Sequence, residues 1–91
     1  MLVMILQRVP VRLRGELTRW LIEPQAGVFV GTVSAMVRDR LWDRCREGLK
    51  GGAMIQIWST NTEQGYRVRT YGATRREVVD HHGLQLIRIP R

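Results

Sequence analysis

The chain has 91 residues, with fifteen basic side chains against eight acidic ones and a formal net charge of +7 at pH 7. That length suits one domain, and a hydrophobic content of 44% excludes a disordered tail. The single cysteine excludes an internal disulfide, and no Cys-x-x-Cys metal spacing is present, so a reducing cytoplasm is expected.

The first predicted element is a strand over LVMILQ, residues 2–7. Its apolar residues do not alternate with polar ones, which is typical of a strand buried on both faces. The run is too short to span a membrane, and it lacks the basic front and cleavage site of a signal peptide. A soluble cytoplasmic protein without a membrane partner is therefore expected.

A helix is predicted next, from Val11 to Glu23. Pro10 suits the first turn of a helix, and Pro24 marks its stop. One face of this helix is apolar and is formed by Leu13, Leu17, Trp20 and Leu21. The opposite face carries a line of alternating charge, made of Arg12, Glu16, Arg19 and Glu23.

The segment AGVFVGTVS, residues 26–34, predicts two short strands with a bulge or tight turn at Gly31. Ser34 is a candidate N-cap for a second helix that runs to about Lys50, with Gly51 and Gly52 as its C-cap. Apolar residues spaced by four place Cys45 in the core on this helix. The three tryptophans are also predicted to be core residues: Trp20, Trp42 and Trp58.

AMIQIWST, residues 53–60, is a second continuous apolar strand, followed by a turn at 62–65. YRVRTYG then alternates, with Arg67, Arg69 and Tyr71 on one face of the next strand. A polar connection, ATRREVVDHHG, leads to a last strand over LQLIRIP.

This order predicts an α+β ferredoxin-like sandwich, with two helices on one face of a mainly antiparallel sheet. The strands at 2–7 and 53–60 are expected to be central neighbours. The other face of the sheet would lack helices, and pairing with a second copy would cover it, so a homodimer is expected. We divide the chain into a core domain, residues 1–77, and a C-terminal strand segment, residues 78–91.

Arginine dominates the basic residues, because all but one of the fifteen are arginine. Arginine binds phosphate through two parallel hydrogen bonds, and a compact domain of this charge attracts polyanions, so a nucleic-acid partner is favoured over a membrane surface. One cluster, Arg8, Arg12 and Arg14, lies at the first strand-to-helix junction. A second, Arg75 and Arg76, lies in the polar connection and is extended by Arg67 and Arg69.

The alternative for the first cluster is a solvated helix face on which Arg12 pairs with Glu16. Few aromatic residues interleave with the arginines, which favours contact with a duplex backbone over stacking on single-strand bases. Gly15 is unusual inside a helix. Close approach by another backbone or a crowded packing site would explain it.

Two further polar stretches are candidates for a functional site. Asp80, His81 and His82 are adjacent, but neighbouring histidines in an extended segment point apart, and a polar turn is the favoured reading. The polar residues STNTE, 59–63, end the central strand and are expected beside the end of the first strand, where they could contribute polar contacts. Turn chemistry explains them equally well.

Four elements together resemble the CRISPR-associated Cas-two family, specifically its type I-E branch. They are VPVRLRG at 9–15, AGVFVGTVS at 26–34, TNTEQG at 60–65 and the TRR triplet at 74–76. The resemblance covers nearly the whole chain. It implies a ferredoxin-like homodimer at the centre of a complex with the Cas-one integrase, which captures duplex prespacer DNA and inserts it at the repeat region of a CRISPR array.

The resemblance also assigns roles to residues. The family's DNA-contacting arginines fall on Arg12, Arg14, Arg75 and Arg76. Its C-terminal segment docks onto the integrase, and an unpaired terminal strand suits such docking by strand addition. The corresponding apolar residues here are Val78, Val79, Leu84, Leu86, Ile87 and Ile89.

Many relatives are described as metal-dependent endonucleases, in which an acidic residue at the end of the first strand binds the metal. Gln7 occupies this position, and its amide lacks the negative charge that a hard divalent cation needs. We therefore expect a non-catalytic protein without a metal or other cofactor. The alternative is a magnesium-dependent endoribonuclease or DNase that uses residues near Gln7, Glu63, or the pair His81 and His82.

Overall fold

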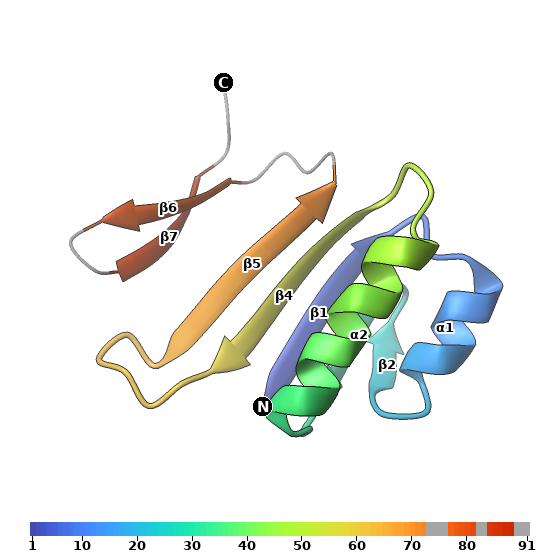
Figure 1. The fold of residues 1–91 in the computed structure, drawn as a ribbon, viewed down its shortest axis with the longest axis horizontal. Helices are drawn as coiled ribbons and strands as arrows, with labels where there is room; N and C mark the ends of the chain where they lie inside the picture. The colour runs from blue at the N-terminus through green and yellow to red at the C-terminus, as the bar shows by residue number, and fades with distance from the viewer. Residues whose placement is uncertain (73–76, 82–83, 89–91) are drawn as a thin grey trace.

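The computed structural model describes residues 1–72, 77–81 and 84–88, with side-chain surroundings for residues 1–72. Figure 1 shows the order of the elements along the chain. They are β1 (Leu2–Gln7), α1 (Val11–Leu17), β2 (Ile22–Gln25), β3 (Val28–Gly31), α2 (Ala35–Gly48), β4 (Ala53–Ser59), β5 (Tyr66–Gly72), β6 (Glu77–His81) and β7 (Leu84–Arg88).

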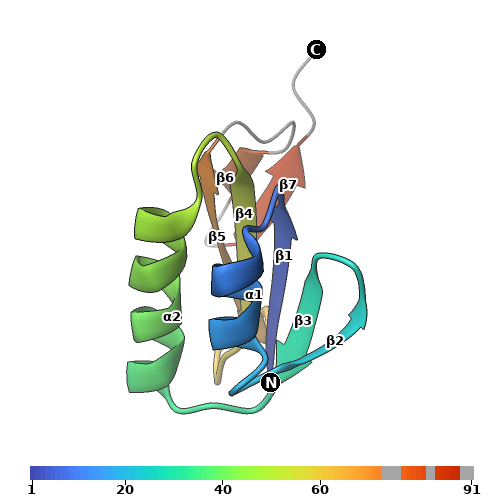
Figure 2. The ribbon, with the colours of Figure 1, turned by 90° about the vertical axis from the view of Figure 1, so that its right-hand side faces the viewer.

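Five strands form one sheet in the order β2-β3-β1-β4-β5, and every neighbouring pair is antiparallel. Both helices cover the same face of this sheet, as Figure 2 shows. The predicted α+β ferredoxin-like fold is therefore confirmed. β1 and β4 are central neighbours as expected, but they pair antiparallel. The two parallel crossovers therefore join β1 to β2 across β3, and β3 to β4 across β1.

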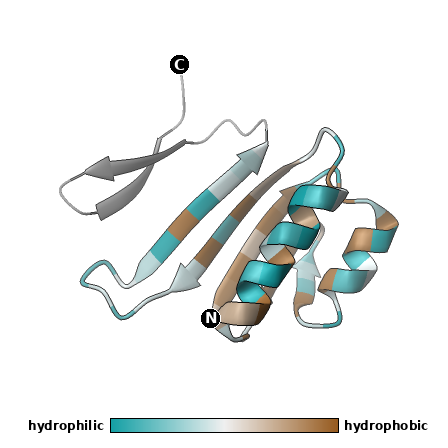
Figure 3. Ribbon diagram, in the orientation of Figure 1, coloured by the Kyte–Doolittle hydropathy of each residue, from teal (hydrophilic) through white to brown (hydrophobic). Residues whose placement is uncertain are grey.

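The core lies between the helices and the sheet. β1 contributes alternate residues to it, Leu2, Met4 and Leu6, each at most 4% exposed. The helices add a second layer, whose buried residues are Leu13, Leu17, Leu41 and Cys45. Figure 3 shows the apolar β1 beneath a largely hydrophilic α2.

The second face of β1 is open in the single chain, so the expectation of burial on both faces is wrong for the chain alone. Ile5 is 37% exposed and Val3 is half-buried. Both helices cover one side only, and the other side of the sheet presents β-branched apolar residues to solvent.

The first helix is shorter than predicted, because it ends at Leu17 instead of Glu23. Residues 18–20 form a turn, in which the Trp20 N–H donates to the Leu17 carbonyl (3.0 Å). The chain then continues as β2, which gains ladder hydrogen bonds from β3 that a longer helix would forgo. As a result Trp20 is 53% exposed, and its predicted place in the core is wrong.

The second helix begins as predicted, because the Ser34 hydroxyl accepts a hydrogen bond from the Val37 N–H (3.2 Å). It ends at Gly48 with Leu49 as its C-cap, so the predicted glycine cap is wrong. Gly52 is needed for another reason. A Cβ there would collide with the backbone carbonyl oxygen of Gln7, so glycine lets the chain entering β4 lie against the end of β1.

The segment around Gly31 forms one strand, β3, which ends at that glycine, and residues 32–34 are neither helix nor strand. The irregularity instead falls in the β2–β3 pairing, where the register shifts between Ile22 and Gln25. Gly15 is exposed, and a Cβ there would meet no described atom within 4 Å, so neither close approach nor crowding within the described chain explains it.

Cys45 is fully buried in the core, as predicted. Burial and, secondarily, the Glu16 carboxylate raise the pKa of its thiol to about 12 from an ordinary 9.0. Since the unfolded chain ionises first, this group's contribution to native stability is present below pH 9 and is lost as the pH rises towards 12.

We expect the Cys45 thiol to resist modification in the native protein, because the thiolate is the reactive form. Its reaction with an aromatic disulfide reagent at neutral pH should follow the loss of helical circular dichroism across a denaturant series. Complete labelling before any loss of the dichroism signal would show that the site is open.

The C-terminal part contains a strand that the sequence reading missed. Residues 77–81, predicted as part of a polar connection, form β6, which pairs antiparallel with β7 in a separate two-stranded sheet. Asp80 and His81 therefore lie in a strand and not in a turn, whereas His82 lies outside the described residues. The domain boundary after residue 77 stays a prediction.

Candidate nucleic-acid interface

Several elements meet at one end of the sheet. Gln7, Ala53 and Gly72 form one row across β1, β4 and β5, so β1 ends where β5 ends. α1 begins and α2 ends at the same end of the molecule (Figure 1). Arg8 immediately follows this row, and the segment that carries Arg75 and Arg76 leaves from it. The described topology thus places the start of the first arginine cluster at this end, and β5 ends there three residues before Arg75 in the sequence.

Arg8 and Arg12 carry uncompensated charge. Both are exposed, and neither side chain forms a hydrogen bond or ion pair with another residue in the described ranges. Arg8 adopts a left-handed backbone conformation (φ 59°), which is unusual for a residue other than glycine. The alternative that Arg12 pairs with Glu16 is wrong, because Glu16 binds Arg44 instead.

Arg14 differs from its two neighbours because it is paired. Its Nε donates to Glu23 Oε2 at 3.1 Å, and the same oxygen accepts the Gly27 N–H at 2.9 Å. The Glu23 side chain is only 17% exposed, while that of Arg14 is 41% exposed. Arg14 therefore holds α1 against the β2–β3 hairpin and keeps only part of its surface for another anion.

The second cluster is only partly described. Arg75 and Arg76 lie outside the described residues, so their placement stays a prediction. Arg67 is exposed on β5, but the Arg69 side chain makes its contacts with other residues of the protein. Its guanidinium lies over the Trp42 ring (4.3 Å to the centroid), and its Nε donates to the fully buried Gln56 at 2.6 Å.

This arrangement confirms the alternation predicted for β5, because Arg69 and Tyr71 face the helices with the Trp42 ring between them. It also corrects the reading of two tryptophans as core residues. Trp42 and Trp58 are half-buried and pack on the edge of the core, where both stack against the Arg69 guanidinium.

Arg69 therefore does not extend a basic surface. Its guanidinium also donates a hydrogen bond to Asp39, which accepts another from Arg38. The pKa of the Asp39 carboxyl is lowered, chiefly by the hydrogen bond from Arg38.

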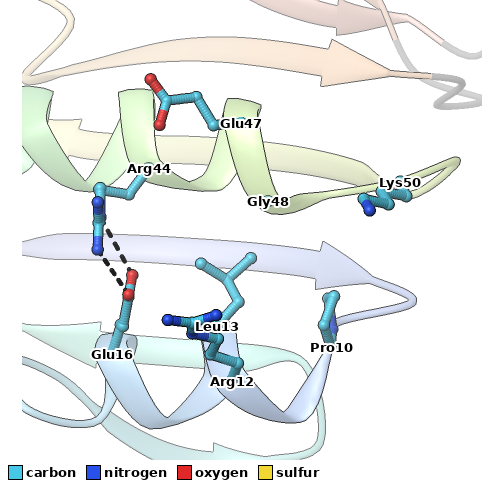
Figure 4. A pocket seen from close by; sticks show the side chains of 8 residues that line it. All are labelled: Pro10, Arg12, Leu13, Glu16, Arg44, Glu47, Gly48 and Lys50. Carbon is cyan, nitrogen blue, oxygen red and sulfur yellow. Dashed lines mark hydrogen bonds and ion pairs between the residues drawn. The ribbon is translucent and has the colours of Figure 1, made fainter.

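Sequence reasoning missed Lys50, a further cation in the same part of the molecule as Arg12. Both line a hollow of about 460 Å³ between α1 and the C-terminal half of α2, shown in Figure 4. Leu13 and Pro10 supply apolar surface to this hollow, and Glu16 and Arg44 close one end with hydrogen bonds of 2.6 and 3.2 Å. The signal in the sequence was the only lysine of the chain, placed where α2 ends.

The residues considered for metal chemistry do not converge. Because β1 and β4 are antiparallel, Ser59 lies beside Met1, to whose carbonyl its N–H donates (3.1 Å), and not beside Gln7. The expectation for residues 59–63 is wrong, because Ser59 ends β4 six residues, or about 20 Å, from the row that contains Gln7, and Glu63 comes after that end. In the ranges that the structure describes, no group of three His, Cys, Asp or Glu side chains is placed to hold a metal ion.

Neither helix of the described part has the length and apolar composition that a bilayer crossing demands. The described residues define an α+β ferredoxin-like sandwich with an excess of unpaired cations at one end. Residues 1–86 match the family described as CRISPR-associated protein (Cas_Cas2CT1978), and the chain therefore belongs to this family. The resemblance noted in the sequence is confirmed at the level of the CRISPR-associated Cas-two type.

Proposed function

We propose that the chain is a non-catalytic, DNA-binding subunit of a type I-E CRISPR adaptation complex in the cytoplasm. It holds duplex prespacer DNA and bridges dimers of the Cas-one integrase, as part of antiviral defence. The observation that carries the proposal is the pair of exposed, uncompensated arginines, Arg8 and Arg12, at one end of a CRISPR-associated fold.

The duplex would be held through its phosphates. Arg8 and Arg12 have no ion-pair partner in the described ranges, Lys50 adds a third cation, and Arg14 contributes the part of its surface that Glu23 leaves open. Arg75 and Arg76 are included because β5 ends at Gly72, in the row of Gln7 and Ala53, three and four residues before them in the sequence. Such contacts grip the backbone without reading sequence.

A homodimer is part of the proposal, because the helix-free face of the sheet is apolar. Strand register places Val3, Ile57 and Val30 in one row and Ile5, Ile55 and Val28 in the next. All six are half-buried or exposed in the single chain. A second copy packed on this face would bury it and present the basic end twice.

The integrase would dock on the C-terminal segment. β6 and β7 form a sheet of their own, with Val79 paired to Leu86 and Val78 to Ile87. A two-stranded sheet leaves backbone groups at its edges free for a partner strand. Leu84 pairs with His81 in the same hairpin, and Ile89 lies outside the described residues.

No metal or other cofactor is part of the proposal. A magnesium-dependent nuclease would need an acid near the end of β1, where Gln7 stands, and Glu63 lies at the opposite end of β4. In the part of the chain that the structure describes, no specific observation favours the nuclease alternative, and it enters only as an outcome of the experiments.

Docking is tested by co-purification of the full chain with the tagged Cas-one integrase. Val79→Asp with Leu86→Asp, one register pair of the hairpin, should abolish co-elution by placing two charges in the docking strands. Asp80→Ala with Gln85→Ala, the next register pair, is the control and should co-elute like the parent. Full retention of the integrase by the Val79/Leu86 variant would contradict the docking assignment.

A further inference from the structure

The groove between the helices continues past the ion pair of Glu16 and Arg44. These two residues line the hollow shown in Figure 4 and also a second hollow of about 130 Å³ on its other side. The second hollow lies between the C-terminal end of α1 and the middle of α2. The other residues that line it are Arg19, Trp20, Arg40 and Leu41.

Trp20 is the unexpected residue of this hollow. It is 53% exposed, although burying a large aromatic ring is among the larger gains of folding. The buried Leu41 provides an apolar surface next to it. An exposed tryptophan in a hollow offers a flat platform for another planar group.

The charge around Trp20 is positive. Arg19, Arg40 and Arg44 line the hollow with one acid, Glu16, which Arg44 already binds at 2.6 Å. Arg19 and Arg40 form no side-chain ion pair with any residue in the described ranges. The hollow therefore combines a stacking surface with two uncompensated cations, and a ligand that fits it is planar and anionic.

We propose that this hollow binds an unpaired nucleotide of single-stranded nucleic acid. The base stacks on the Trp20 indole, while Arg19 and Arg40 bind the adjoining phosphates. An acidic protein would also satisfy the charge. A nucleic-acid strand is favoured because the same groove reaches Arg12 at its other end, which belongs to the proposed duplex interface. The site rests on the proposed nucleic-acid role but adds a second form of ligand.

The test compares Trp20→Ala with the parent in binding a labelled thymidine oligonucleotide of about ten residues and a duplex of mixed sequence. We expect the alanine variant to bind the single strand about tenfold or more weakly, the usual effect of losing one stacked base, and to bind the duplex within about twofold of the parent. Trp20→Phe keeps an aromatic ring and should recover most of the single-strand affinity.

Two controls separate stacking from general surface effects. Met36→Ala removes another exposed apolar side chain (71%) from α2 that lines neither hollow, and Arg46→Ala removes an arginine paired with Asp43 at 3.9 Å. Both should bind the single strand like the parent. Quenching of tryptophan fluorescence by the oligonucleotide should diminish in Trp20→Phe.

The proposal is overturned if Trp20→Ala binds the single strand as the parent does. Equal loss of single-strand and duplex binding would also overturn it, because Trp20 would then support the fold or the duplex interface. Unchanged DNA binding together with lost association with an acidic protein partner would replace it by protein docking. If the parent binds neither DNA, the proposed function itself fails, which the duplex measurement on the parent shows separately.

Discussion

Ile5→Glu is expected to yield a folded monomer. Ile5 lies at the centre of the helix-free face, paired with Val28 on one side and Ile55 on the other. In the proposed homodimer its side chain would be enclosed between two sheets, where an unpaired carboxylate costs several kcal/mol. In the single chain the residue is already 37% exposed, so the fold should tolerate the change.

We expect the dimer dissociation constant of Ile5→Glu to rise at least about 100-fold, equivalent to about 3 kcal/mol. Sedimentation equilibrium over a series of protein concentrations measures this constant directly. Met36→Glu adds the same charge at an exposed apolar position on the helical side and should leave the dimer intact. A dimer of parental stability in Ile5→Glu would show that the helix-free face is not the interface.

Arg12→Ala combined with Arg14→Ala is expected to give the largest loss of duplex binding. Each lost phosphate contact should lower the slope of log affinity against log salt by about one unit. Arg12 is uncompensated, whereas Arg14 shares Glu23, so Arg12→Ala alone should account for most of the change in slope. The affinity of the double variant should fall about tenfold to 100-fold at low salt.

Fluorescence anisotropy with a labelled duplex, between about 50 and 200 mM salt, measures both quantities. Arg46→Ala is the matched control, because this arginine is half-exposed and paired with Asp43 within α2. Thermal unfolding of Arg14→Ala should be monitored, since removing Arg14 leaves the 17%-exposed Glu23 carboxylate without its cation. A salt slope equal to the parent's would contradict the assignment of these arginines.

The sequence predicted most of the framework because apolar periodicity reports burial. Continuous runs identified β1 and β4, alternation sorted the faces of β5, and Ser34 marked the start of α2. Each of these signals can be read within a single segment of the sequence. The helix-free face, inferred from topology, is present as an open apolar surface.

The predictions from sequence were wrong where residues far apart in the sequence determine the local structure. The apolar spacing of Leu13, Leu17 and Leu21 suggested one long helix, but the ladder with β3 drew residues 22–25 into a strand and left Trp20 exposed. Pairing along the helix predicted Arg12 with Glu16, yet Glu16 binds an arginine from α2. Neither partner can be found by counting along the sequence.

Only part of the candidate site could be predicted, because some of its residues are brought together by tertiary packing. Arg8 and Arg12 stand out by charge and by their place after β1. Lys50 and Trp20 acquire a role only when α1 packs against α2 and their hollows form. The distance between Glu63 and Gln7 follows from the antiparallel pairing of β1 and β4, which strand order along the chain left open.

The central claim is that this chain holds DNA without cutting it. Its most direct test is a titration of end-labelled duplex with the purified protein in magnesium, followed by native and denaturing gels of the same samples. We predict a shifted complex that weakens with salt and DNA of unchanged length. Chelator-sensitive fragments that disappear in a Glu63→Gln or His81→Ala variant, or an absence of any salt-dependent complex, would contradict the claim.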